Sequence, residues 1–175
     1  MKRISIVGSG GAGKSTFAHQ LASILHLPVI HLDSLYWQPG WIATPQDEWR
    51  EKQQHMVQQE CWIIDGNYTS TLDMRFAVAD TIIFLDFPRL LCLYRAVKRQ
   101  IQFAGKTRPD MAKGCPERID REFLLWIWNY PNNGRVRVLK KIEQYQEGKQ
   151  VVILHSPRQV QQFLHMLKIR ENLTA

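Results

Sequence analysis

Residues 8–16, which read Gly8-Ser9-Gly10-Gly11-Ala12-Gly13-Lys14-Ser15-Thr16, decide the fold. They fit the phosphate-loop pattern G-x-x-x-x-G-K-[ST]. Glycines allow backbone conformations that are closed to residues with a Cβ, so several N–H groups can converge on one phosphate. Lys14 is expected to reach the β- and γ-phosphates of ATP, and the Ser15 hydroxyl to bind Mg²⁺. The alternative is a glycine-rich turn with an incidental lysine.

The residues on either side of this loop favour the phosphate-binding interpretation. Residues 3–7 are short, apolar and β-branched, which predicts a buried strand. Phe17, Leu21, Ile24 and Leu25 then follow at the spacing of one helical face. A strand, a glycine loop and a helix therefore succeed one another in the order that the motif requires.

Length and composition indicate one domain spanning residues 1–175. The chain is 45% hydrophobic, enough for a sizeable core, and it lacks a run of about 18 apolar residues, so no membrane helix is expected. The N-terminus enters a strand at once, leaving no room for a signal peptide. Cys61, Cys92 and Cys115 are far apart and lack metal-site spacing, which predicts reduced thiols in a cytoplasmic protein.

The formal net charge is +7. Such a balance suits a polyanionic partner, either nucleotide phosphates or nucleic acid. A solvated basic face without a partner is the other interpretation.

Apolar strand-like runs alternate with helical patterns along the chain. Alternation of this kind predicts a parallel sheet with right-handed crossovers, here in a three-layer α/β P-loop NTPase. The expected strands are residues 3–7, 27–32, 61–66, 80–86 and 151–154; the expected helices begin near residues 13, 44, 71, 88, 117, 135 and 157.

Three of these strands end in an acidic residue: Asp33, Asp65 and Asp86. Ligands of open α/β sheets bind beyond the carboxyl ends of the strands, so Asp33 should face the site. Residues 80–86 look like a Walker-B strand, whose Asp86 would help to hold Mg²⁺ through water.

Aromatic residues crowd the segment after Asp33, where Tyr36, Trp37 and Trp41 surround a Pro-Gly turn. They are interpreted as an aromatic lip over a substrate pocket. The alternative is a loop that its aromatic side chains hold against the domain.

A polar, basic segment with glycines covers approximately residues 103–118 and looks like a mobile lid. Phosphoryl transfer needs positioning, positive charge on the equatorial oxygens and exclusion of water. Arg95, Arg99 and Arg108 would supply that charge in bidentate form. Solvation at the surface is the alternative for each of them.

These features favour phosphoryl transfer from ATP to a small acceptor. The chain is too short for the extra domains of a motor, and no guanine-reading N-K-x-D is present. An ATP-regulated nucleic-acid-binding protein is the less favoured alternative, since no DNA-reading signature is visible. Its support is a set of basic clusters: Arg135, Arg137, Lys140, Lys141, Lys168 and Arg170.

The phosphate loop, Ile64-Asp65-Gly66, Asp86-Phe87-Pro88 and the arginine-bearing lid resemble the adenylate-kinase-like P-loop kinases. More narrowly, residues 31–41, 65–68 (Asp65-Gly66-Asn67-Tyr68), 105–111 and 126–131 resemble the FlaR-type "DNA topology modulation" proteins, over nearly the whole chain. The wider resemblance implies strand order 2-3-1-4-5 and a lid that closes over ATP. It also implies an adenine pocket between Arg95 or Arg99 and Ser156-Pro157-Arg158.

The chain departs from the adenylate type at the acceptor side. Kinases of that type carry an arginine soon after the second strand to grip a monophosphate, whereas here none occurs between Asp33 and Arg50, and Arg75 is the nearest replacement. Asp33 resembles the carboxylate that shikimate- and gluconate-type kinases place against a hydroxyl acceptor, where it takes the proton or orients the acceptor near Mg²⁺. The acceptor is thus a nucleoside monophosphate or a hydroxyl metabolite, met by these residues: Asp33, Trp37, Trp41, Asp65, Tyr68 and Arg75.

Overall fold

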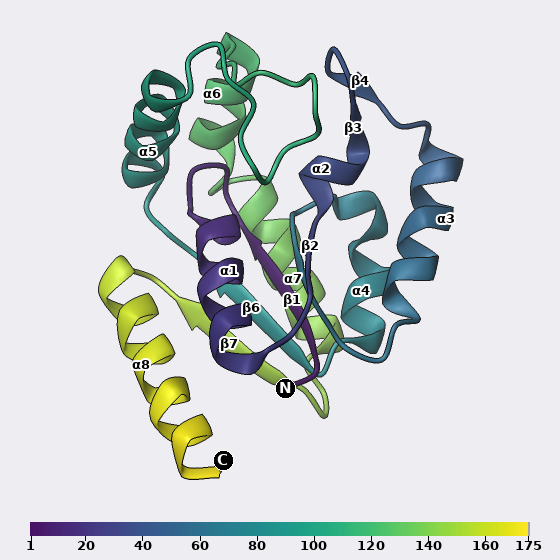
Figure 1. The fold of residues 1–175 in the computed structure, drawn as a ribbon, viewed down its shortest axis with the longest axis vertical. Helices are drawn as coiled ribbons and strands as arrows, with labels where there is room; N and C mark the ends of the chain where they lie inside the picture. The colour runs from purple at the N-terminus through teal and green to yellow at the C-terminus, as the bar shows by residue number, and fades with distance from the viewer. Residues whose placement is uncertain (175) are drawn as a thin grey trace.

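A five-stranded parallel sheet forms the centre of the computed structural model, which describes residues 1–174 (Figure 1). The strand order is β2-β5-β1-β6-β7, which confirms the predicted order 2-3-1-4-5 when the sheet strands are counted along the chain. β1 is central: its Ile4 lies opposite Ile63 on one side and Thr81 on the other. The strands are β1 (Arg3–Gly8), β2 (Val29–His31), β5 (Trp62–Asp65), β6 (Thr81–Leu85) and β7 (Gln150–Leu154).

Helices cover both faces of the sheet and so bury its apolar side chains. Ile4 and Ile6 of β1 pack in the cluster that includes α1 and α8, whereas Val7 packs with α3, α4 and α7 on the other face. This alternation is that of a strand buried on both sides. The helices are α1 (Lys14–Leu25), α3 (Gln46–Val57), α4 (Leu72–Val78), α7 (Gly134–Tyr145) and α8 (Pro157–Thr174).

Two further helices, α5 (Arg89–Gln102) and α6 (Arg121–Asn129), lie above the carboxyl end of the sheet (Figure 1). The segment between them corresponds to the predicted lid, and its ends meet in a bridge between Ala104 and Glu117. It reaches toward a small antiparallel hairpin made of β3 (Trp37–Gln38) and β4 (Ile42–Ala43).

The second strand is shorter than residues 27–32. It ends at His31, and residues 32–36 form the short helix α2 (Leu32–Tyr36). Leu32 is fully buried, and the Ser34 hydroxyl donates to the His31 carbonyl at 2.8 Å. The backbone therefore turns directly after the strand, and Asp33 stands in the first turn of α2.

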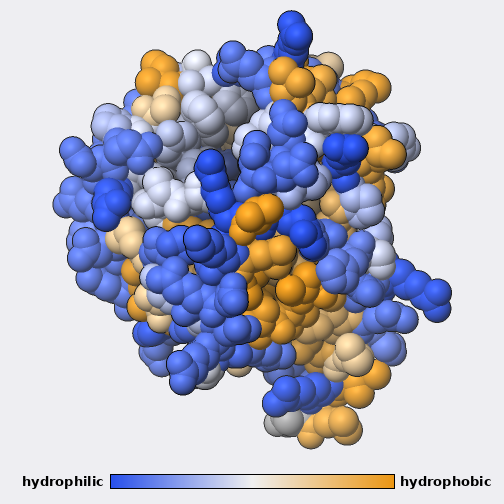
Figure 2. Space-filling model, turned by 180° about the vertical axis from the view of Figure 1, so that it is seen from behind, coloured by the Kyte–Doolittle hydropathy of each residue, from blue (hydrophilic) through white to orange (hydrophobic). Residues whose placement is uncertain are grey.

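Several apolar side chains of α5 face solvent. Cys92 and Ala96 are the fully buried residues of this helix, while Tyr94 is 64% and Ile101 73% exposed. The opposite side of the molecule also shows apolar residues at its surface, over β7 and α8 (Figure 2). Sequence periodicity alone did not distinguish these exposed positions from core.

Within residues 1–174, no helix combines the length and apolar character that crossing a membrane requires. The three cysteines are free thiols: Cys92 and Cys115 are buried and Cys61 is partly buried.

Candidate active site

A cavity of about 1140 Å³ opens at the carboxyl edge of the sheet. Its wall is formed by the phosphate loop, the start of α2, the end of β5, α5, the segment between α5 and α6, and the start of α8. The sheet topology explains this meeting, because all the strands are parallel and their following loops emerge at one edge.

The phosphate loop needs glycine at two positions for different reasons. Gly13 precedes α1 with φ 92°, in the left-handed region that favours glycine. Gly11 has φ 75°, and a Cβ there would lie 2.1 Å from the Cys92 carbonyl oxygen of α5. The loop is thus pressed against α5, and the N-terminus of α1 points its free N–H groups at the cavity.

Lys14 is half-buried, and its Nζ donates to the carbonyls of Gly8 (3.0 Å) and Ser9 (3.1 Å). Burial lowers its pKa, an effect that the charges of Asp33 and Asp65 oppose. The Ser9 hydroxyl is also buried, without a hydrogen-bond partner in the described chain. The Lys14 ammonium group has only carbonyl partners, and the Ser9 hydroxyl has none. Both features fit a loop that binds a phosphate group.

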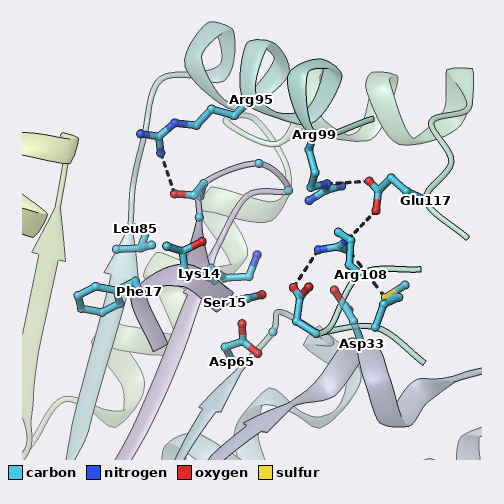
Figure 3. Close-up of a pocket in the computed structure, with 18 of the residues that line it drawn as sticks. Lys14, Ser15, Phe17, Asp33, Asp65, Leu85, Arg95, Arg99, Arg108 and Glu117 are labelled. Carbon is cyan, nitrogen blue, oxygen red and sulfur yellow. Dashed lines mark hydrogen bonds and ion pairs between the residues drawn. The ribbon is translucent and has the colours of Figure 1, made fainter. Parts of the chain in front are cut away.

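Asp33 and Asp65 face the same space as Lys14 and Ser15 (Figure 3). Asp65 is buried at the end of β5, and its Oδ1 lies 2.8 Å from Nδ1 of His31. Burial alone would lower the pKa of His31, but the hydrogen bond and charge of Asp65 outweigh it and raise that pKa. A carboxylate with one oxygen engaged retains its second oxygen for a ligand.

The Tyr68 hydroxyl donates to Asp33 Oδ1 at 2.7 Å. Burial, together with the adjacent carboxylate, raises the pKa of Tyr68, so the phenol stays protonated. Its backbone φ is 35°, a conformation that costs a residue with a Cβ about 1–2 kcal/mol. The surrounding structure therefore holds Tyr68 against Asp33 at some cost in backbone strain.

Arginines enter the cavity from α5 and from the segment after it (Figure 3). Arg95 Nη1 donates to the Ala12 carbonyl at 3.2 Å. Arg99 and Arg108 both donate to Glu117, whose side chain is only 2% exposed. Arg108 also donates to Asp110 at 2.8 Å. Burial alone would raise the pKa of Asp110, but the charge of Arg108 and the hydrogen bond from Ser15 outweigh it and lower that pKa.

The β3–β4 hairpin contacts the segment between α5 and α6 through backbone groups. Trp41 Nε1 donates to the Pro116 carbonyl at 3.1 Å, and Gly40 N donates to the Gly114 carbonyl at 2.9 Å. The Cys115 thiol lies 3.1 Å from the Gln38 carbonyl. The hairpin and the segment between α5 and α6 are thus joined beside the cavity.

Trp37, Trp41 and Tyr68 line the cavity and belong to a larger aromatic cluster. The ring centroids of Trp37 and Trp41 are 5.4 Å apart at 66°, and Tyr36 packs 5.0 Å from Trp37 and 4.7 Å from Tyr68. Edge-to-face contacts of this kind fix ring orientations. The rings are packed against the domain and also border the cavity, and their role toward a substrate stays a prediction.

Asp86 departs from its predicted place. It is not among the residues that line the large cavity; it borders a separate hollow of about 300 Å³ with Arg135 and His155. Arg135 binds both carboxylate oxygens of Asp86, at 2.8 and 2.9 Å, so the pair is bidentate. β5 and β6 both pair with β1, but only Asp65 lines the cavity with Ser15, because the carboxylate of Asp86 is bound to Arg135.

Arg75 is also outside the cavity. It is fully buried, and its guanidinium donates to the carbonyls of Gly66 (2.7 Å) and Asn67. Burial lowers its pKa to about 9, which leaves it protonated at neutral pH. Arg75 therefore fixes the backbone after β5, and the structure does not offer it as a grip for a monophosphate.

Most other predicted residues lie together. The carbonyls of Gly8 and Ser9 accept hydrogen bonds from Lys14. Pro157 lines the cavity, whereas Arg158 does not. The predicted residues that line the cavity are Gly10, Gly11, Ala12, Gly13, Lys14, Ser15, Thr16, Asp33, Trp37, Trp41, Asp65, Tyr68, Arg95, Arg99, Arg108 and Pro157.

Sequence reasoning assigned no site role to Asp110, Glu117 or Phe123, which all line the cavity. A Cβ on Gly10 would lie 2.8 Å from the Phe123 ring, so α6 packs directly on the phosphate loop. Asp110 and Glu117 had one signal, their position within or beside a segment rich in arginine. The arginines that these two acids pair with depend on how that segment folds back on itself.

Comparisons with known proteins bear on the fold. No family model matches the sequence, and no curated protein is similar to it. A solved shikimate kinase from Acinetobacter baumannii, in complex with shikimate, is 15% identical, with TM-score 0.57; the match covers 99% of this chain and 94% of that one. A deoxyadenosine kinase from M. mycoides, with dCMP and dCDP bound, is 13% identical, with TM-score 0.51, covering 98% and 99%.

At these identities the likeness is one of fold. The chain has the α/β architecture of the P-loop kinases, with the five-stranded parallel sheet and flanking helices that the sequence predicted. The resemblance to FlaR-type proteins stays an expectation from the sequence.

Proposed function

We propose that this protein is a phosphotransferase that moves the γ-phosphoryl group of Mg-ATP to a small acceptor. The observation that carries the proposal is the convergence of Lys14, Asp33 and the arginines Arg99 and Arg108 on one cavity at the phosphate loop. The shikimate kinase and deoxyadenosine kinase that share the fold are consistent with it.

The loop from Gly8 to Thr16 would bind the phosphates of ATP through its N–H groups and through Lys14, whose present carbonyl partners are easily replaced. Arg95, near the Ala12 carbonyl, and Pro157 would border the nucleotide. Arg99 and Arg108 would place positive charge on the transferred group. Glu117 keeps these two guanidinium groups at one point of the cavity.

Ser15 and Asp65 supply oxygen ligands of the kind that Mg²⁺ prefers, and they lie at the same end of the cavity as Asp33. When bound, the ion would neutralise charge on the β- and γ-phosphates. Asp65 takes the place that the sequence suggested for Asp86, because Arg135 already occupies the carboxylate of Asp86.

Asp33 would accept the proton of an acceptor hydroxyl. Tyr68 binds its Oδ1, so Oδ2 is the oxygen available for the acceptor. The acceptor oxygen then forms its bond to the γ-phosphorus as the bond from that phosphorus to the β,γ-bridging oxygen breaks. The products are the phosphorylated acceptor and ADP, and the proton resides on Asp33 until solvent removes it.

The nucleic-acid alternative gains little from the structure. Two cations of the basic set are paired within the chain, Arg135 with Asp86 and Lys141 with Asp73. Such pairs would have to open before those cations could meet a polyanion.

The test is ATP-dependent transfer with radiolabelled γ-phosphate across a panel of acceptors, in the wild-type protein and in Lys14→Ala. Removal of the lysine should lower turnover by at least about 100-fold. Lys98→Ala, an exposed lysine on α5, is the matched control and should change turnover less than about twofold. Equal turnover in the Lys14 variant and the wild type would refute the proposal.

A further inference from the structure

The part of the cavity around Asp33 is walled by aromatic rings. Trp37 and Trp41 lie edge to face there, with Tyr68 beside them. Aromatic walls bury the flat face of a ring, whether a base or a sugar, while a nearby carboxylate orients its hydroxyls. Shape and chemistry in this region therefore fit a compound with a ring and a hydroxyl group.

The same region is acidic. Asp33, Asp65 and Asp110 all line it, from α2, β5 and the segment between α5 and α6. A phosphate or carboxylate on the acceptor would approach these side chains as a like charge. Like-charge contacts in a desolvated site disfavour binding by several kcal/mol.

Most arginines that might offset this repulsion are already engaged. Arg75 is buried and donates to backbone carbonyls. Arg99 and Arg108 share the carboxylate of Glu117 and, in the proposed function, meet the transferred phosphoryl group of ATP rather than the acceptor. Recognition of a phosphomonoester normally uses several charge-assisted donors, often a bidentate arginine.

Arg118 is the remaining candidate on the acceptor side. It is exposed, lines the cavity, and its guanidinium carbon lies 4.8 Å from the centre of the Trp41 ring. One exposed guanidinium, stacked on an aromatic ring, is a weak counterpart to the carboxylates of Asp33 and Asp65, while Asp110 is already paired with Arg108.

We infer that the acceptor is an uncharged ring compound with a free hydroxyl, a sugar or a nucleoside, rather than a phosphorylated one. The inference rests on the proposed function and specifies the substrate class of the same site. The acceptor ring packs against Trp37 and Trp41, its hydroxyl donates to Asp33, and the new ester is the first phosphate it carries.

The experiment compares matched pairs as acceptors with radiolabelled ATP. Each pair is an uncharged compound and its monophosphate: adenosine and AMP, deoxycytidine and dCMP, glucose and glucose 6-phosphate. The uncharged member of at least one pair should be phosphorylated, with kcat/KM at least about 100-fold above that of its monophosphate. The nucleoside pairs and the sugar pair together show which of the two kinds of ring compound is the acceptor.

Variants separate acceptor binding from ATP binding. Trp37→Leu and Trp41→Leu should raise the acceptor KM at least about tenfold and leave the ATP KM within about twofold. The control is Trp128→Leu on α6, a tryptophan that packs under Arg89, 4.0 Å from the ring centre, and does not line the cavity. It should change neither KM.

Preferential transfer to a monophosphate, especially one that Arg118→Ala abolishes, would overturn the inference and leave the kinase proposal intact. A second result would also overturn the inference. In that result the protein releases ADP from ATP in a Lys14-dependent way, but no uncharged compound is phosphorylated and none changes the tryptophan fluorescence when it is added. Absence of Lys14-dependent ATP turnover with every acceptor would instead refute the proposed function itself.

Discussion

Trp41 donates its indole N–H to the Pro116 carbonyl at 3.1 Å, a contact between residues 75 positions apart in the chain. It joins the β3–β4 hairpin on the aromatic side to the segment that carries Arg108. The two walls of the cavity are therefore coupled by a side chain that also borders the cavity itself.

Trp41→Phe should loosen this coupling while keeping an aromatic ring in the wall. Losing one hydrogen bond of this kind costs about 1 kcal/mol, so backbone amides of residues 103–118 should exchange about fivefold faster. Hydrogen exchange measured by mass spectrometry checks this. Exchange in α3, remote from the contact, is the internal control, and equal exchange in the segment would contradict the prediction.

Glu117→Gln should destabilise the protein, because two arginines lose the carboxylate that they share. The side chain is 2% exposed, and replacing one partner of a buried ion pair leaves the other charges poorly compensated. We expect the free energy of unfolding to fall by about 2–3 kcal/mol in urea denaturation. Glu143→Gln, an exposed position on α7, should change it by less than about 0.5 kcal/mol.

Gly11→Ala tests the contact between the phosphate loop and α5. Gly11 and Gly40 have similar dihedral angles, φ 75° and 80°, but a Cβ at position 11 would meet the Cys92 carbonyl at 2.1 Å, whereas one at Gly40 meets nothing within 4 Å. Gly40→Ala should cost only the backbone strain, about 1 kcal/mol. Gly11→Ala should cost more than about 3 kcal/mol, as a clash with backbone forces the helix and loop apart. Similar midpoints in thermal unfolding for the two variants would show that the loop can move away from α5.

Asp80 should make stability depend on pH. Its Oδ2 accepts from the backbone N–H groups of Lys2 (2.6 Å) and Arg3 (2.9 Å). Burial opposes the charged form, but the hydrogen bonds from Thr81 and from these N–H groups outweigh it and lower the pKa of Asp80 below 3.8. A carboxyl group whose pKa is lowered by folding adds stability above its unfolded pKa and loses it as the pH falls through the folded one.

Asp80→Asn should therefore be less stable than the wild type at pH 7, by only about 1 kcal/mol, since Asp80 is exposed to solvent. The difference should shrink as the pH falls below about 4. Urea denaturation of both proteins from pH 7 to pH 3 measures it. A difference that stays constant over this range would mean that the charge of Asp80 has no part in the effect.

Asp65→Asn and Asp86→Asn form a matched pair on neighbouring parts of the sheet edge. Asp65 lies in the cavity with Ser15, so its variant should lower turnover by at least about 100-fold and raise the Mg²⁺ concentration needed. Asp86 pairs with Arg135 outside the cavity, so its variant should lose about 1 kcal/mol of stability with turnover changed less than threefold. The reverse order of turnover would restore Asp86 as the acid of the nucleotide site.

The fold followed from local patterns. The run from Arg3 to Val7, the glycine loop and the face of Phe17 and Leu21 predict a strand, a turn and a helix with little dependence on distant residues. Once that unit is identified, parallel pairing and handedness restrict the order of the remaining strands. The sequence thus predicted the sheet and the edge at which the site lies.

The roles of individual charges were less predictable. Asp65 and Asp86 both follow apolar strands that pair with β1, and they differ in that Arg135, distant in sequence, binds the carboxylate of Asp86 outside the cavity. Arg75 looked available because a charged residue is rarely buried, yet the carbonyls of Gly66 and Asn67 compensate its burial. The exposure of Tyr94 and Ile101 on α5 could not be read from the sequence, because periodicity does not report which face of a helix a neighbouring element covers.

Asn67 binds both backbone groups of Gly8: its Oδ1 accepts from the N–H at 3.0 Å and its Nδ2 donates to the carbonyl at 2.7 Å. This side chain, which lies beyond the end of β5, bonds the last residue of β1 and so extends the hydrogen bonding between the two strands. The entrance to the phosphate loop is consequently preorganised before a nucleotide arrives. Little of the binding energy of a nucleotide would then be lost in ordering the turn, so more of it would remain as affinity.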